Sequence, residues 1–259
     1  MCTRCMSDLY QESDIETIML QVAAEHLRRF QRIKSLFLSK TKVPQEGNWR
    51  DKSNNDIWLE IVAEIVVIGR SEPWDRLKAR TDLKSRIAWE NLLEIGSQEE
   101  LRRIINQVLL AVSTRYASND VSKSVKAKAL AYNFNVLKGF EDGPRGFLTK
   151  LSELKGSDAD NSRIKAVMNT LMYIKNKGAR DLLMELGLIR NAIALDVRIQ
   201  TILQKVGIEV LKDFQNNSKL YDEIENDILT KICTPLGISG VEFDRMLYQN
   251  YEDIMKANL

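Results

Sequence analysis

Apolar residues recur at helical spacing along most of the chain, and charged residues lie between them. The first such pattern predicts one long helix over residues 13–38, and a polar stretch with proline and glycine at 41–55 predicts a connector. A second helix is expected from about Asp56, ended by Gly69 and Pro73. The same pattern predicts further helices at about residues 83–94, 98–115, 121–138, 144–155 and 161–174.

The helical pattern is clearest in the last third of the chain. Apolar residues over 178–186 share one face, and Gly187 follows at the position of a helix C-cap glycine. Another helix is predicted to begin at Asp196 and to end at Gly207, and residues 209–257 predict two or three more. Because β-branched runs are short and interrupted by charges, we predict an all-α fold.

Composition describes an ordinary globular protein that is large enough for one large domain or two lobes. The chain has 259 residues, of which 44% are hydrophobic and 29% are charged. The formal net charge of +2 is too small to indicate a nucleic-acid partner. Its distribution is more informative, because residues 161–180 contain basic side chains and no acidic one: Arg163, Lys165, Lys175, Lys177 and Arg180. Such a run, with a second cluster at Lys123, Lys126 and Lys128, is typical either of solvated helix faces or of a phosphate-binding strip.

The cysteines do not predict a disulfide framework or a metal centre. Cys2 and Cys5 have the CxxC spacing, but a zinc site would also need both His26 and Cys233. The four closely spaced cysteines of an iron–sulfur cluster are absent from the sequence. We therefore expect no metal and no cofactor.

No segment resembles a signal peptide or a membrane span. Residues 1–14 lack an apolar stretch of the required kind, and the most apolar stretch, 57–68, is interrupted by Glu60 and Glu64. We expect a cytoplasmic protein that has no membrane partner.

One pair of charged residues has a specific spacing. Lys177 is followed two places later by Ala179, and nineteen residues after Lys177 comes Asp196 in the segment Asp-Val-Arg-Ile. Ile202, Val206 and Gly207 keep the register of the helix that follows. This stretch, residues 171–208, resembles the core motif of the helix-hairpin-helix DNA glycosylases, the superfamily of endonuclease III and the 8-oxoguanine DNA glycosylases. A less specific resemblance extends upstream to about residue 55.

The resemblance implies two helical lobes, with a DNA-binding helix-hairpin-helix and an active-site cleft between them. The central lobe would span residues 51–192 and end in the hairpin. The second lobe would combine residues 193–259 with N-terminal helices from residues 1–50.

The resemblance also implies an enzyme: a base-excision-repair glycosylase with β-elimination lyase activity at abasic sites. Members that carry a lysine at this place generally act on oxidised bases, which favours 8-oxoguanine. Lys177 would form a Schiff base with the sugar, and the Asp196 carboxylate would stabilise the positive charge that develops on it.

Both site residues also have an interpretation from local chemistry. The helix dipole and the nearby cations Lys175 and Arg180 predict a lowered pKa for Lys177, which would leave more free amine at neutral pH. Asp196 taken alone is explained as a helix N-cap worth about 1 kcal/mol.

The hairpin departs from the family pattern, since Tyr173 and Lys175 stand where two glycines are expected. Either the turn is remade or side chains hold the phosphate instead of the backbone. We predict phosphate contacts from four residues: Lys175, Gly178, Arg180 and Arg198. The candidates for a pocket that stacks the extruded base are Phe134, Phe243 and Tyr248, each of which is alternatively a core residue.

The expected partner is damaged double-stranded DNA, bound by a monomer, and in a prokaryote the protein would be associated with the nucleoid. Two other functions remain open at this point. One is a non-catalytic DNA-binding protein on the glycosylase scaffold, and the other is a helical interaction module.

Overall fold

The computed structural model describes residues 20–67, 71–210 and 214–259, and these contain helices and turns but no strand. The all-α prediction is therefore confirmed. Helix α1 spans Ala24–Phe37, so it covers the later part of the long helix expected over 13–38. The prediction was wrong for residues 20–23, which are described and are not helical. Residues 13–19 of that expected helix, together with Gly69, Cys2 and Cys5, lie outside the described residues.

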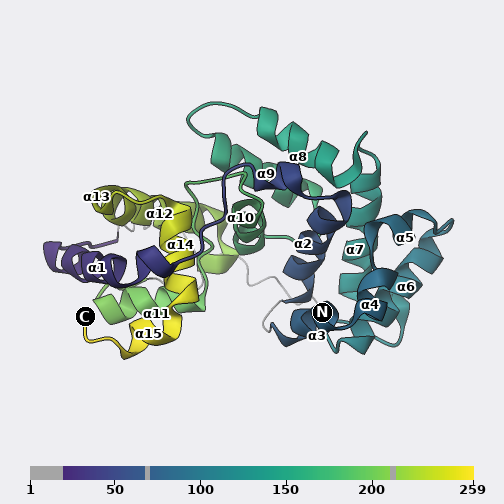
Figure 1. The fold of residues 1–259 in the computed structure, drawn as a ribbon, viewed down its shortest axis with the longest axis horizontal. Helices are drawn as coiled ribbons and strands as arrows, with labels where there is room; N and C mark the ends of the chain where they lie inside the picture. The colour runs from purple at the N-terminus through teal and green to yellow at the C-terminus, as the bar shows by residue number, and fades with distance from the viewer. Residues whose placement is uncertain (1–19, 68–70, 211–213) are drawn as a thin grey trace, which may run out of the picture.

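A central lobe is formed by consecutive helices, drawn on the right and top of Figure 1. They are α2 (Asn54–Val66), α3 (Glu72–Ala79), α4 (Thr81–Arg86), α5 (Trp89–Leu93), α6 (Gln98–Ala111), α7 (Val125–Lys138), α8 (Gly143–Glu153) and α9 (Ala159–Thr170). Two predictions were wrong here. Pro73 does not end a helix but lies in the first turn of α3, where its missing N–H costs nothing. The single helix expected at 83–94 is two, and the Trp58 indole donates to the carbonyl of Ile87 at the break, at 2.8 Å.

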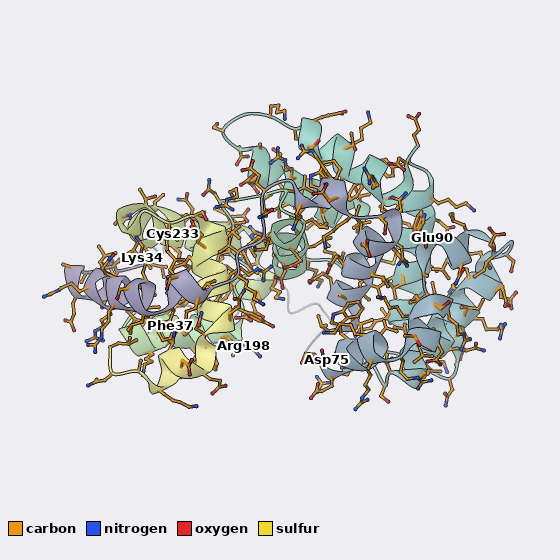
Figure 2. All side chains as sticks on the ribbon, viewed as in Figure 1. Lys34, Phe37, Asp75, Glu90, Arg198 and Cys233 are labelled. Carbon is orange, nitrogen blue, oxygen red and sulfur yellow. The ribbon has the colours of Figure 1, made fainter. Side chains whose placement is uncertain are left out.

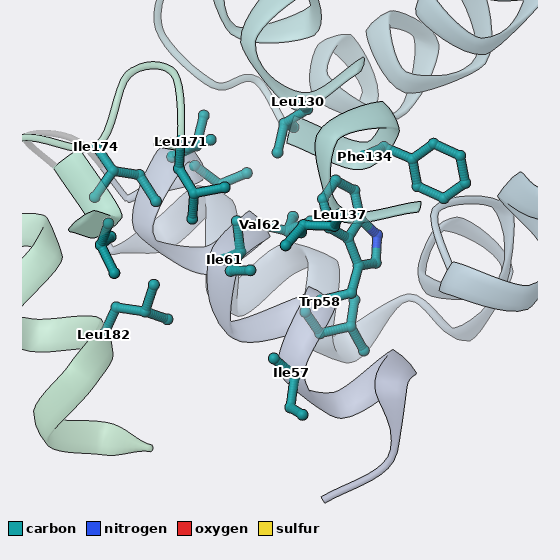
Figure 3. Close-up of a cluster of buried hydrophobic side chains, with 14 of the residues drawn as sticks. Ile57, Trp58, Ile61, Val62, Leu130, Phe134, Leu137, Leu171, Ile174 and Leu182 are labelled. Atoms are coloured by element: carbon teal, nitrogen blue, oxygen red, sulfur yellow. The ribbon is translucent and has the colours of Figure 1, made fainter. Parts of the chain in front are cut away.

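Aromatic rings form the centre of the central lobe. Trp58 contacts Phe134 at 5.7 Å between ring centroids, and Trp89 contacts Phe134 at 4.6 Å. Aliphatic side chains of α2, α7 and the segment after α9 surround these rings, as Figure 3 shows for Ile61, Leu130 and others. Burial of this cluster stabilises the lobe.

The second lobe joins the two ends of the chain. Helix α1 packs with α11 (Val197–Val206), α12 (Ser218–Ile228), α13 (Thr234–Leu236), α14 (Gly240–Gln249) and α15 (Tyr251–Lys256), on the left of Figure 1. Its core pairs Phe30 of α1 with Phe243 of α14, at 5.5 Å between centroids. The Leu20 N–H donates to Asp227 of α12 at 2.7 Å, so residues from both termini hold this lobe together.

Two crossings of the chain between the lobes are bonded to each other. The Gly47 N–H donates to the carbonyl of Gly187 at 2.8 Å. Gly187 has a positive φ of 63° after helix α10 (Asn176–Glu185), which confirms the predicted C-cap glycine. A Cβ at this position would lie 2.1 Å from the carbonyl oxygen of Gln45, so the crossing leaves no room for a side chain. Helix α10 lies between the lobes in Figure 1.

Within the described ranges, no helix combines the length and the apolar character that crossing a membrane requires.

Candidate functional site

A tight turn joins α9 to α10 without the expected glycines. The turn runs over residues 171–175, and Tyr173 in its centre has a positive φ of 73°. This left-handed conformation is costly for a residue with a Cβ, and it is the conformation that glycine adopts freely. Lys175, at the second expected glycine, is extended with φ −112° and needs no glycine. The turn is therefore remade with one strained tyrosine.

An asparagine of the central lobe fixes this turn. The Asn133 side chain donates to the Met172 carbonyl at 3.0 Å and accepts from the Met172 N–H at 2.6 Å. Ile174 is buried beside it and anchors the turn in the core (Figure 3). Asn133 was not predicted as a functional residue, although a polar residue on the apolar face of a helix was a visible signal in the sequence.

Lys177 lies in the first turn of α10 and pairs with an acid on the same helix. Its ammonium donates to Asp181, one turn further along. The other carboxylate oxygen of Asp181 accepts from Arg245 of α14 at 2.8 Å. The Lys177 side chain is 37% exposed and that of Asp181 17%. Asp181 is therefore shared between a cation of its own helix and a cation of the second lobe.

The predicted lowering of the Lys177 pKa is wrong. Burial disfavours the ammonium, but the negative charges of Asp181, Glu64 and Asp196 outweigh burial and raise the pKa of Lys177 above its ordinary value. Lys175 and Arg180, which were expected to lower the pKa of Lys177, do not do so. The Lys175 side chain is exposed, and that of Arg180 is bound to acids of α12. In the free protein Lys177 is an ammonium ion.

Two carboxyl groups near this lysine titrate close to neutral pH. Burial and the charge of Asp181 raise the pKa of Glu64 in α2 to about 8. Burial likewise raises the pKa of Asp244 in α14 to about 7, and its carboxylate accepts from the Ala194 N–H at 2.8 Å. Gly178 allows the approach of Glu64, because a Cβ there would lie 3.3 Å from the Glu64 carboxylate. The contact found for Gly178 is thus with a protein acid, and a role in phosphate binding stays a prediction.

Asp196 is the N-cap of α11. One of its carboxylate oxygens accepts from the N–H groups of Arg198 at 2.9 Å and Ile199 at 3.0 Å. Its charge also contributes to the raised pKa of Lys177, so the two groups interact across the boundary of the lobes. The capping role is confirmed, whereas the catalytic role stays a prediction.

Arg180 is not available to a DNA phosphate, which corrects the prediction for this residue. Its side chain is 1% exposed and stacks on the Tyr221 ring, 4.3 Å from the centroid. The guanidinium donates to Glu225 at 2.6 to 2.9 Å and to Asp222 at 2.7 Å. Glu225 also accepts from the Ile193 N–H at 2.7 Å. This network ties α10 to α12.

Two of the three candidate base-stacking aromatics belong to the cores. Phe134 is 2% exposed in the central core and Phe243 is fully buried in the second, so neither ring faces a pocket. Tyr248 is 40% exposed and lies between two surface hollows of about 390 and 250 Å³. Lys177 and Asp196 line neither hollow.

Lys175 and Arg198 are exposed, as phosphate contacts require. The Arg198 guanidinium stacks on Tyr248 at 4.7 Å from the ring centroid. Figure 2 places Arg198 at the edge of the second lobe nearest the central lobe. Their contact with DNA stays a prediction.

No group of three or more potential metal ligands from His, Cys, Asp and Glu occurs in the described part of the chain. Cys233 is buried, and burial raises the pKa of its thiol to about 12, which disfavours the thiolate at neutral pH. The CxxC pair lies outside the described residues.

The chain has the all-α fold of the 8-oxoguanine DNA glycosylases. The enzyme of Thermotoga maritima superposes with a TM-score of 0.56 at 19% identity, over 86% of this chain and 93% of its own. That of Methanocaldococcus jannaschii gives 0.60 at 15% identity, over 87% and 96%. Its 8-oxoguanine glycosylase/lyase in complex with a 15mer DNA containing 8-oxoguanine gives 0.58 at 15% identity, over 86% and 94%.

No family model and no curated protein sequence matches the chain. At these identities the structural comparison establishes the fold, and the resemblance predicted from residues 171–208 is confirmed at that level.

Proposed function

We propose that the protein is a DNA glycosylase that excises an oxidised base, with 8-oxoguanine as the first candidate, and then cleaves the strand as a lyase. The observation that carries the proposal is that the Asp196 charge acts on the Lys177 ammonium. Lys177 stands in the first turn of α10 and Asp196 caps α11. The fold supports it, since similarly folded proteins are 8-oxoguanine DNA glycosylases.

The chemistry divides between these two residues. Lys177 first loses its ammonium proton to solvent, and the neutral amine attacks C1′ of the deoxyribose as the glycosidic bond breaks. The electron pair of that bond leaves with the base, which takes up a proton. The Asp196 carboxylate offsets the positive charge that develops on the sugar. Opening of the sugar ring gives an imine at C1′. Removal of a C2′ proton then expels the 3′ phosphate and breaks the strand.

DNA is held in this proposal by exposed cations on both lobes. Lys175 lies at the hairpin and Arg198 at the first turn of α11, so both flank the site. Phosphate contacts of this kind position the duplex without reading its sequence. We expect a monomer that binds damaged double-stranded DNA in the cytoplasm.

Borohydride trapping tests the proposal, because it reduces the Schiff base to a permanent covalent adduct. The wild-type protein should give an adduct with DNA that contains an abasic site or 8-oxoguanine, and Lys177→Gln should give none. Lys150→Gln is the matched control, since that lysine is 69% exposed on α8 and should trap as wild type. Circular dichroism and a binding titration establish that Lys177→Gln still folds and binds DNA.

Each alternative has its own result in this experiment. A wild-type protein that binds DNA but gives no adduct and releases no base is a non-catalytic DNA-binding protein. Trapping that persists at wild-type yield in Lys177→Gln assigns the nucleophile to another amine, with Lys175 and Lys165 next to be replaced.

A further inference from the structure

Asp181 uses its two carboxylate oxygens to bind two cations from different lobes. Oδ2 accepts from Lys177, one turn earlier on α10, and Oδ1 accepts from Arg245 of α14 at 2.8 Å. Arg245 is itself held by Glu185 at 3.4 Å and lies 3.6 Å from Asp244. The Asp181 side chain is only 17% exposed. Water therefore screens the attraction between Asp181 and its two cations less than it screens an ordinary surface ion pair.

The charged groups around the Lys177 amine are mostly acidic. Those that act on it directly are Asp181, Glu64 and Asp196, and further charges act on these acids. Taken by element, they are Glu60 and Glu64 on α2, Asp181 and Glu185 on α10, Asp244 and Arg245 on α14, and the N-cap Asp196 of α11. Only Asp181 is bonded to the lysine within the described residues.

We propose that Asp181 is a positioning residue that holds Lys177 as an ammonium ion at the start of α10 and thereby sets the pH at which its amine can attack DNA. The inference rests on the proposed function, because it needs Lys177 to be the nucleophile. Attack requires loss of a proton from the ammonium, and the Asp181 charge opposes that loss. Arg245 moderates the effect by binding the same carboxylate.

The rate of Schiff-base formation against pH tests this inference. DNA with a preformed abasic site isolates the step from base release, and the adduct is trapped in single turnover between about pH 6 and pH 9.5. In the wild type the rate should rise about tenfold for each pH unit below the lysine pKa. Asp181→Asn keeps the shape and one of the two acceptor oxygens but removes the charge, so this rising limb of the pH–rate profile should move at least about one unit lower. The rate at pH 7 then rises about tenfold.

Three variants make the result specific. Asp181→Glu retains the charge and should keep the wild-type limb. Glu25→Gln breaks an ion pair of the same i, i+4 spacing on α1 and should leave the limb in place. Arg245→Gln removes the moderating cation, so its limb should move to higher pH. This variant keeps the test valid even if Asp181→Asn does not fold.

The outcomes separate the two proposals. A wild type that gives no adduct at any pH overturns the proposed function and this inference together. A wild type that traps, with an Asp181→Asn limb at the same pH, overturns the inference alone, as does an Arg245→Gln limb that fails to rise. The inference is supported if the limb of Asp181→Asn moves to lower pH and that of Arg245→Gln moves to higher pH.

Discussion

Helix α10 carries two charge networks on different faces, and they differ in how completely each charge is paired. Arg180 lies on the face toward α12, fully buried and bonded to two carboxylates and a backbone carbonyl. Lys177 lies on the face toward α2 and α14, partly exposed and bonded to one shared carboxylate. The two residues are three positions apart in sequence.

The comparison shows which charges can take part in chemistry. A buried guanidinium with all three of its nitrogens bonded presents no exposed face to a ligand, so Arg180 fixes the position of α10 against the second lobe. The Lys177 ammonium is partly exposed, and the pKa values of Glu64 and Asp244 around its partner Asp181 are raised toward neutral, so this network keeps both solvent access and protons to exchange. Four variants test this contrast.

The largest effect is expected for Arg180→Met, which leaves Glu225 buried without its cation. Removing one partner of a buried ion pair costs about 3–5 kcal/mol, so the free energy of unfolding in urea should fall by that amount. Adding Glu225→Gln removes the stranded charge while keeping an acceptor for the Ile193 N–H, and should recover much of the loss. Lys177→Gln should cost less than about 1 kcal/mol, because its pair is partly exposed. Equal losses for both single variants would contradict the contrast.

Asp196→Asn should separate stability from catalysis. Asparagine caps a helix nearly as well as aspartate, so the free energy of unfolding should change by well under about 1 kcal/mol. It carries no charge, and loss of such an electrostatic stabiliser commonly costs on the order of a hundredfold in rate. Base release from 8-oxoguanine DNA is measured in single turnover. Asp120→Asn is the control, because Asp120 also caps a helix, the short Val121–Lys123, and its replacement should not change the rate. A near wild-type rate in Asp196→Asn would show that Asp196 only caps α11 and has no part in catalysis.

Glu64→Gln should flatten the dependence of stability on pH. The pKa of Glu64 is raised to about 8 in the folded protein from an ordinary 4.5, so the unfolded chain releases this proton first. Stability from this group is therefore fully present below about pH 4.5 and is lost as pH rises toward 8. Between about pH 5 and pH 8 the wild type should lose more than about 1 kcal/mol that Glu64→Gln does not lose. Equilibrium unfolding at both pH values measures the difference, and parallel losses would refute it.

The smallest effect concerns an exposed cation of the hairpin. Each phosphate contact contributes roughly 0.9 to the slope of log affinity against log salt, so Lys175→Ala should flatten that slope by about one unit. Lys150→Ala, on the exposed surface of α8, should leave the slope unchanged. The double variant of Arg180 and Glu225 should also leave it unchanged, since that network is closed to DNA. The slopes are measured by fluorescence titration between roughly 50 and 200 mM salt. An unchanged slope in Lys175→Ala would contradict the prediction.

Helix ends marked by local chemistry were readable from the sequence. Gly187 and Gly207 adopt positive φ values of 63° and 101° after α10 and α11, as C-cap glycines do, and Asp196 caps α11. The break between α4 and α5 was not, because the Ile87 carbonyl there is bonded by a tryptophan of another helix. Hydrophobic periodicity carries no record of such tertiary contacts.

The site was only half readable for the same reason. Lys177 and Asp196 were found from their spacing, and Asp181 was available at i+4 from the lysine. The acids and cations that determine the lysine pKa come from α2 and α14, which are distant in sequence. Arg180 was misassigned because its partner Glu225 lies 45 residues away in the sequence. The local sequence shows the positive charge of Arg180 but not the distant acid that the fold brings to it.

The second lobe has a consequence for the order of folding during synthesis. Residues 54–170 of the central lobe are contiguous, so this lobe can form while the ribosome is still producing the rest of the chain. Helix α1 is synthesised before the central lobe, yet Phe30 is buried against Phe243, and Leu20 is bonded to Asp227, 207 residues later. Closing so long a loop makes these contacts slow to form. Helix α1 is therefore among the last elements to reach its native position, and its apolar face stays exposed until the C-terminal helices have been synthesised.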